Sequence, residues 1–108
     1  MYPVSDMQRA ARFYQEDLGL KKEGLASDYW IEFDIGGGTF GIGNFEQVGA
    51  PGTAQALCLE IEGLDDFRSR LTQRGIESTD PHDLQACRIS MVRDPDGNQV
   101  WLHERKRG

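Results

Sequence analysis

The chain has 108 residues, of which 38% are hydrophobic, and this suits a single domain with a modest core. Its 18 acidic and 12 basic side chains are mixed along the sequence and give a net charge of −6, which argues against nucleic-acid binding because that needs clustered Lys and Arg. No apolar run approaches the roughly 18 residues that span a bilayer, and the N-terminus has no apolar leader, so we expect a cytoplasmic protein without a membrane partner.

The first predicted elements are a short extended stretch over residues 1–4 and an amphipathic helix behind it. Ser5 or Asp6 can cap the helix start, and Gly19 ends it. The helical spacing predicts an apolar stripe made of Met7, Ala10, Ala11, Phe13, Tyr14 and Leu18.

Two strands of a hairpin are predicted next. Residues 29–35 alternate, turn through Gly36–Gly38 and return as residues 39–45. Residues 46–53, with two glycines and a proline, form the predicted linker to the second half.

The second half repeats this order. An extended run over residues 56–61 precedes a helix with the stripe Leu64, Phe67 and Leu71, which Gly75 ends. A second hairpin is predicted from residues 87–93 and 99–105, joined by the strong turn sequence of residues 94–98. The basic run of residues 105–107 is expected to be a solvated end of the chain.

The two halves align with each other at an offset of about half the chain. The aligned pairs are Val4 with Ile61, Gly19 with Gly75, Ile31 with Ile89 and Phe33 with Met91. The predicted fold is therefore α+β, a single domain over residues 1–108. Repeat one covers about residues 1–46 and repeat two about residues 54–108, each a βαβββ unit, and together they form a curved mixed sheet around a cup.

At this point the sequence resembles the vicinal oxygen chelate superfamily, which includes glyoxalases, bleomycin-resistance proteins and extradiol dioxygenases. The residues that carry the resemblance are Val4-Ser5-Asp6 opening a helix with Phe13-Tyr14, then Leu18-Gly19-Leu20, and Asp94-Pro95-Asp96-Gly97-Asn98 before an apolar strand. The resemblance covers almost the whole chain. It implies a first strand that starts before Met1, so that this strand is truncated here.

Alternation along each predicted strand separates side chains that pack on the helices from side chains that face the cup. The residues expected to pack on the helices are Ile31, Phe33, Ile35, Phe40, Ile42, Leu57, Leu59, Ile61, Ile89, Met91, Val100 and Leu102. The predicted ligand-binding residues face the cup and are Trp30, Glu32, Cys58, Glu60, Arg88, Ser90, Trp101 and His103. Polar groups placed among aromatic surface are typical of a small-molecule site. The alternative is that the two tryptophans cover a dimer seam or plug the sheet.

The resemblance also implies where a metal would bind, because enzymes of this superfamily hold a divalent ion with His and Glu from four strands. Carried over to this sequence, the second position falls at Gly41 to Gly43, the third on Ala56 and the fourth on Trp101, and the first lies upstream of Met1 or on a residue that cannot bind a metal. None of these side chains coordinates a metal. No metal site and no cofactor are therefore predicted.

A substitute metal set stays open, because Glu32, Cys58, Glu60 and His103 all lie on the predicted cup face. Carboxylates, a thiol and an imidazole scattered over several strands are nevertheless not a recognised metal-binding combination.

We expect a metal-free protein that binds a small aromatic or cationic compound in the cup, with no catalytic residue assigned. One alternative is an enzyme of the glyoxalase (lyase or isomerase) or dioxygenase class, either metal-dependent or using Glu32, Glu60 or His103 for acid–base chemistry. Another is an interaction module in which the sheets serve dimerisation. A homodimer is expected under all three hypotheses, because the half-repeats have open edges. Cys58 and Cys87 lie in apolar strand-like runs and are expected to be free thiols in a reducing compartment.

Overall fold

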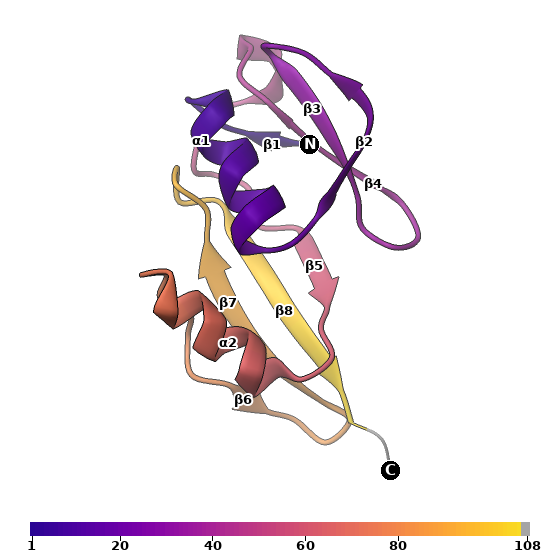
Figure 1. Cartoon of the computed structure of the whole chain (residues 1–108), viewed down its shortest axis with the longest axis vertical. Helices are drawn as coiled ribbons and strands as arrows, with labels where there is room; N and C mark the ends of the chain where they lie inside the picture. Colours follow the sequence, from indigo (N-terminus) through magenta and orange to yellow (C-terminus); the bar gives the residue numbers. More distant parts are fainter. Residues whose placement is uncertain (107–108) are drawn as a thin grey trace. The chain divides into compact units, whose positions relative to one another are not determined.

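The computed structural model describes residues 1–106 and divides into two compact units (Figure 1). The first unit contains Met1–Ala54 and also Asp94–Asn98, and the second contains Gln55–Arg93 and the chain from Gln99 onward. Arg107, the last residue of the predicted basic run, lies outside the described residues. Within residues 1–106, neither helix is long and apolar enough to cross a membrane.

The first unit is one βαβββ module with a four-stranded mixed sheet. Its elements are β1 (Tyr2–Pro3), α1 (Met7–Arg12), η1 (Phe13–Asp17), β2 (Lys21–Ala26), β3 (Trp30–Asp34), β4 (Thr39–Gly43) and the 3₁₀ turn η2 (Glu46–Val48). The sheet order is β1-β4-β3-β2, in which β1 runs parallel to β4 and the other pairs are antiparallel. The first strand, predicted to be truncated, has two residues.

The second unit repeats that topology. Its elements are β5 (Leu57–Glu60), α2 (Leu64–Gln73), β6 (His82–Asp83), β7 (Cys87–Arg93) and β8 (Gln99–Arg105). The sheet order is β5-β8-β7-β6, again with one parallel pair, β5 with β8. The predicted α+β fold with two βαβββ modules is confirmed.

The first helical segment changes its winding after the six residues of α1. The Asp6 carboxylate accepts a hydrogen bond from the Arg9 backbone N–H and caps the helix, as one of the two predicted caps. From Phe13 onward the segment becomes a single π-helical turn, in which the Leu18 N–H donates to the Phe13 carbonyl. Gly19 then ends it with a φ of +77°, a conformation that glycine adopts without strain.

The core of the first unit is aromatic and lies between the helical segment and one face of the sheet. The predicted stripe is buried throughout. The Tyr14 ring packs on Phe33 and Phe40 at centroid distances of 6.0 and 5.0 Å, and Tyr2 meets Phe40 edge to face at 5.0 Å. These rings fix which face of the first sheet the helix covers.

The turn predicted at residues 94–98 belongs to the first unit and carries its buried polar network. The Tyr14 hydroxyl donates to Asp94 at 2.8 Å, and the Asn98 amide nitrogen donates to Asp94 at 2.8 Å and to the Pro3 carbonyl at 2.7 Å. The Asn98 side-chain oxygen accepts from the Ala54 N–H at 3.0 Å. Burial raises the pKa of Tyr14, and the neighbouring Asp94 raises it further, so the phenol stays protonated. Buried polar groups that are satisfied in this way stabilise the fold.

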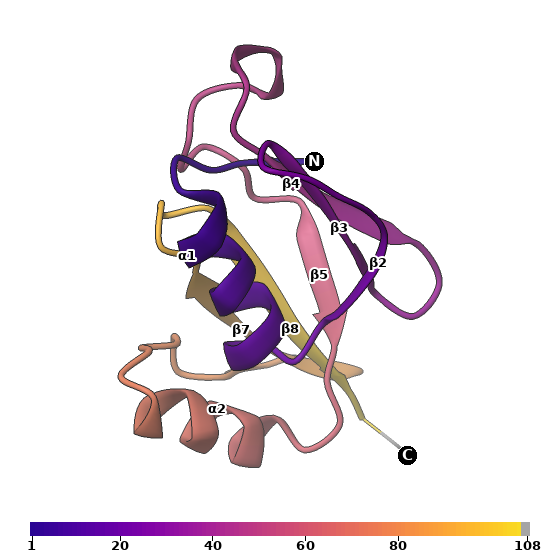
Figure 2. The same cartoon turned by 45° about the horizontal axis from the view of Figure 1, so that its top comes forward.

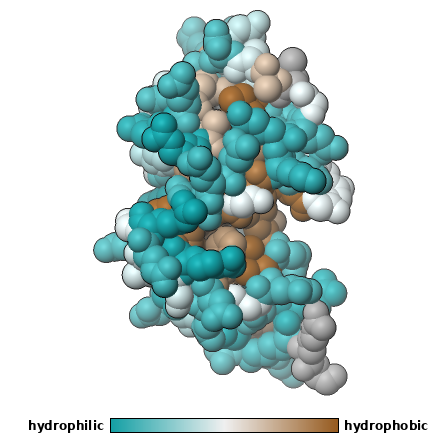
Figure 3. Space-filling view, viewed as in Figure 1, coloured by the Kyte–Doolittle hydropathy of each residue, from teal (hydrophilic) through white to brown (hydrophobic). Residues whose placement is uncertain are grey.

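In the second unit, α2 covers one face of the sheet: it lies in front of β7 and β8 in Figure 1 and below them in Figure 2. Leu64 and Leu71 of the predicted stripe are fully buried, together with Val100 and Leu102 of β8, whereas Phe67 is half-buried. The view in Figure 3 shows mostly hydrophilic side chains at the surface, in keeping with the 28% of charged residues.

Candidate functional site

Each sheet has one face packed against its helix and one face without a helix, which we call the open face. The open face of the second sheet is organised as two rows of side chains across β5, β8 and β7. The strand pairing aligns Cys58, Trp101 and Met91 in one row and Glu60, His103 and Ile89 in the other. Neighbouring strands lie about 4.8 Å apart, so side chains of one row are adjacent.

Trp101 stands at the centre of the first row. Its indole Nε1 donates a hydrogen bond to the Gln55 carbonyl at 3.2 Å, which fixes the orientation of the ring, and the residue is half-exposed. An indole held in this way offers a flat apolar surface beside Cys58 and Met91. It suits stacking with a planar or positively charged group.

A carboxylate and an imidazole form the centre of the second row. Nδ1 of His103 lies 2.7 Å from Oε1 of Glu60, close enough for an ion pair when the imidazole is protonated, although this approach lacks hydrogen-bond geometry. The Glu60 side chain is 65% exposed and that of His103 is 24% exposed. The pair therefore presents a negative charge and a titratable ring to a molecule on this face.

The two cysteines are free. Cys58 of β5 pairs with Trp101 on one side of β8, and Cys87 of β7 pairs with Arg105 on the other side. The two cysteines are therefore separated by β8 and by four residues along it, which is too far for a disulfide. Burial raises the pKa of Cys58, and the charge of Glu60 raises it further. The thiol is therefore protonated near neutral pH and is a poor nucleophile.

On the open face of the first sheet, the predicted positions of Trp30 and Glu32 agree with the structure. Trp30 pairs with Gly43 and Glu32 with Gly41, on the face opposite to Phe33 and Phe40. The Trp30 ring is stacked on Phe45 at 5.8 Å with an interplanar angle of 19°. A Cβ added at Gly43 would lie 3.0 Å from Val48 and 3.1 Å from Phe45, so the glycine makes room for those side chains.

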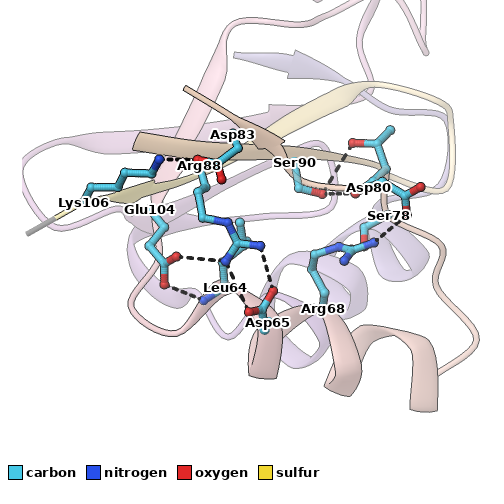
Figure 4. A network of polar contacts seen from close by, with 11 residues as sticks. Leu64, Asp65, Arg68, Ser78, Asp80, Asp83, Arg88, Ser90, Glu104 and Lys106 are labelled. Carbon is cyan, nitrogen blue, oxygen red and sulfur yellow. Dashed lines mark hydrogen bonds and ion pairs between the residues drawn. The ribbon is translucent and has the colours of Figure 1, made fainter. Parts of the chain in front are cut away.

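The prediction that Arg88 and Ser90 face the cup is wrong, because both lie on the face of β7 that α2 covers. Arg88 binds Asp65 of α2 through two nitrogens at 3.0 and 3.2 Å and reaches Glu104 at 3.5 Å (Figure 4). Ser90 is buried, and its hydroxyl donates to the Thr79 carbonyl at 2.6 Å.

The predicted alignment of Ile31 with Ile89 was one residue out of register. In the first sheet Ile31 pairs with Ile42, and the equivalent pair in the second sheet is Ser90 with Leu102. Ile31 therefore corresponds to Ser90 and not to Ile89. A shift of one residue moves every side chain of a strand to the other face. Ile89 and Met91, predicted to pack on the helix, therefore lie on the open face together with Cys87.

The donor set that a catalytic metal would need does not fit this chain. Gly41 and Gly43 have no side chain, and Ala56 and Trp101 have no metal-binding atom. Among the residues that the structure describes, no group of three or more His, Cys, Asp or Glu side chains could hold a metal ion. The substitute set left open by the sequence, Glu32, Cys58, Glu60 and His103, does not form such a group.

Each unit also has a surface groove. One, of about 850 Å³, runs along α1 and is lined by residues that include Gln8, Arg12 and Lys22. The other, of about 770 Å³, lies beside Glu60, Gly63 and Glu104 in the second unit. Neither groove has an aromatic residue in its lining, so neither provides the aromatic surface found on the open faces.

Two βαβββ modules of identical topology, each with an aromatic open face, define the class of fold. A family model, the Glyoxalase/Bleomycin resistance protein/Dioxygenase superfamily, matches residues 1–102, and the chain belongs to this superfamily. A search of the curated proteins found no match.

Solved structures agree with this assignment. TnmS3, an antibiotic binding protein from Streptomyces sp. CB03234, is 27% identical with a TM-score of 0.84, over 97% of this chain and 91% of that chain. A glyoxalase/bleomycin resistance protein from the same organism is 27% identical with a TM-score of 0.81, over 94% of this chain and 93% of that one. Lactoylglutathione lyase from Agrobacterium tumefaciens has a TM-score of 0.80 over 96% of this chain and 88% of that chain, but at 21% identity it shows the fold alone.

Proposed function

We propose that this protein binds a small aromatic or cationic compound on its open faces without a metal ion. The observation that carries the proposal is the row Cys58–Trp101–Met91. In this row the indole of Trp101 occupies a position where the superfamily resemblance implies a metal ligand, and the thioether of Met91 lies beside it. The proposed ligand-binding residues are those on the open faces: Trp30, Glu32, Cys58, Glu60, Trp101 and His103 as predicted from the sequence, with Ile89 and Met91 added.

Charge and surface chemistry support a flat or positively charged ligand. Trp101 is half-exposed with its Nε1 already bonded, so its ring face is the part left for stacking. Glu60 supplies negative charge one row away, and the whole chain carries −6. The similarity to TnmS3, an antibiotic binding protein, is consistent with capture of such a compound.

Tryptophan fluorescence tests this proposal with N-methylquinolinium, N-methylacridinium and propidium as probes. We expect saturable quenching by at least one of them, and a loss of affinity of about tenfold in Trp101→Phe, since a desolvated cation–aromatic contact contributes about 1–2 kcal/mol. Phe67→Leu on α2 is the control and should bind like the wild type. No quenching by any of the three probes would reject the proposal.

An acid–base enzyme of the glyoxalase class is the second candidate, favoured by the Glu60–His103 pair. The carboxylate of Glu60 lies 2.7 Å from Nδ1, which leaves Nε2 as the ring nitrogen that can exchange a proton with a substrate. Formation of lactoylglutathione by the wild type and not by His103→Gln would support this candidate. A stoichiometric divalent metal in protein purified without chelators would support its metal-dependent form.

The proposal also includes a homodimer and a cytoplasmic location. Ile89 and Met91 add apolar area to an open face, and such faces are commonly covered by a partner. Free Cys58 and Cys87 suit a reducing compartment. Light scattering during gel filtration measures the first point: a mass near 12.2 kDa rather than twice that value would reject the dimer.

A further inference from the structure

The open face of the second sheet carries a charged residue that the proposed function does not use, Arg93 at the end of β7. Its neighbour Val92 is buried on the face that α2 covers, so alternation along the strand places Arg93 on the open face, in line with Met91. The residue is exposed, and within residues 1–106 its guanidinium has no ion-pair partner. By contrast, Arg88 on the helix-covered face binds Asp65. The positive charge of Arg93 is therefore left to meet a bound molecule.

Arg93 and Glu60 lie at opposite corners around Trp101. Arg93 pairs with Gln99, which lies two residues before Trp101 on β8. Glu60 pairs with His103, which lies two residues after Trp101 on the same strand. Because β7 and β5 flank β8 on its two sides, both charged residues are diagonal neighbours of the indole. Diagonal neighbours in a sheet are within reach of long side chains.

The distance between the two charged residues indicates the size of a ligand that would contact both. Two strand spacings of about 4.8 Å and four residues of about 3.3 Å separate the Cα atoms of Glu60 and Arg93, so these atoms are about 16 Å apart. The two side chains are too far apart to form an ion pair with each other. Both can lean inward over the sheet, and a planar ring on Trp101 fits between their charged ends.

From this arrangement we propose that the ligand of the open face is a planar aromatic zwitterion. Its ring stacks on Trp101, its positive group lies toward Glu60 and a carboxylate lies toward Arg93. This rests on the proposed small-molecule function and deepens it, because it adds an anionic group to the ligand and names Arg93 as the residue that selects this group. A guanidinium suits a carboxylate because its N–H donors match two oxygens.

Two probes that differ in one substituent test for the anionic group, 1-methylquinolinium-6-carboxylate and 1-methylquinolinium-6-carboxamide. Both have the same ring and the same positive charge, and only the first has a negative charge at the far end of the ring. We expect tryptophan quenching to give a dissociation constant for the carboxylate about threefold to fivefold lower, which is the strength of an exposed ion pair. The titrations are made at low ionic strength because salt screens exposed charges.

Arg93→Gln is the variant that assigns this preference to one side chain. It should lower the affinity for the carboxylate to that for the carboxamide and leave carboxamide binding unchanged, which also shows that the variant is folded. Arg93→Lys keeps the charge and should keep most of the preference. Arg105→Gln is the matched control: it removes a positive charge from the same face, but Arg105 lies beyond His103 on β8. This control should leave the ratio of the two affinities unchanged.

Glu60→Gln tests the opposite end of the ligand. Both probes carry the positive ring nitrogen, so this variant should weaken both by a similar factor of about threefold to fivefold and leave their ratio unchanged.

Equal affinities of the wild type for the two probes, or a preference for the carboxylate that persists in Arg93→Gln, would overturn the inference. No quenching by either probe would overturn it as well. In each of these cases, saturable quenching by N-methylquinolinium that Trp101→Phe weakens would leave the proposed function standing.

Discussion

Aromatic side chains have different surroundings on the helix-covered face of one sheet and on the open face of the other. On the helix-covered face of the first sheet, Tyr14, Phe33 and Phe40 pack ring against ring and are almost wholly buried. On the open face of the second sheet, Trp101 and His103 stay half-exposed in rows with neighbours of mixed chemistry. The covered faces therefore stabilise the fold, whereas the open face of the second sheet keeps Trp101 and His103 partly exposed.

The largest effect that this comparison predicts is on the buried polar network of the first unit. Asn98→Ala removes donors to Asp94 and Pro3 and an acceptor for Ala54, so buried groups lose their partners. We expect the free energy of unfolding in urea to fall by about 3 kcal/mol. Asn44→Ala, at an exposed site with a single 3.4 Å contact, is the control and should change it by less than about 0.5 kcal/mol.

Adjacent residues of β7 test the assignment of its two faces. Val92 is buried under α2, so Val92→Ala should cost about 2 kcal/mol of folding free energy. Met91 is half-exposed on the open face, so Met91→Ala should cost less than about 1 kcal/mol. Urea unfolding of both variants measures the difference, and the reverse order would restore the face assignment derived from the sequence.

A smaller effect is expected at Ser90, which the sequence placed in the ligand site. Ser90→Ala removes the hydroxyl that donates to the Thr79 carbonyl and should lower the free energy of unfolding by about 1 kcal/mol, with probe binding unchanged. Ser69→Ala on the exposed side of α2 provides the comparison. Loss of probe affinity in Ser90→Ala without loss of stability would place Ser90 at the ligand after all.

The smallest predicted effect depends on pH. The hydrogen bond and the charge of Arg88 hold the pKa of Asp65 below its ordinary value of 3.8. A carboxyl with a lowered pKa in the folded state stabilises the protein above its unfolded pKa and loses that contribution as the pH falls through its folded pKa. The difference in unfolding free energy between wild type and Asp65→Asn should therefore be constant above about pH 5 and shrink below pH 4. A difference that grows on acidification would contradict this, and Asp66→Asn is the control.

Much of the fold follows from local sequence patterns. The apolar spacing of the first helix, its cap at Asp6 and its end at Gly19 are visible in the chain, and the hairpin strands 87–93 and 99–105 have the predicted bounds. Each of these depends on interactions within a few residues, which spacing and turn chemistry encode.

The faces of β7 could not be predicted in the same way. Both faces carry apolar residues, Ile89 and Met91 on one and Val92 on the other, so alternation alone does not distinguish them. Burial of Ser90 is possible because Thr79, eleven residues earlier, accepts its hydrogen bond. The packing of Phe45 beside Gly43 was not predicted either, because its stack on Trp30 joins residues of different segments.

The position of a bound ligand can be read directly from the three methionines of this chain. Met91 lies on the open face of the second sheet, and Met7 is buried in the helix-covered core. In protein labelled with ¹³C at the methionine methyl groups, titration with N-methylquinolinium should shift the Met91 signal, identified with Met91→Leu, and leave Met7 in place. A shift of Met7 with Met91 unmoved would contradict the claim that the open face is the binding surface.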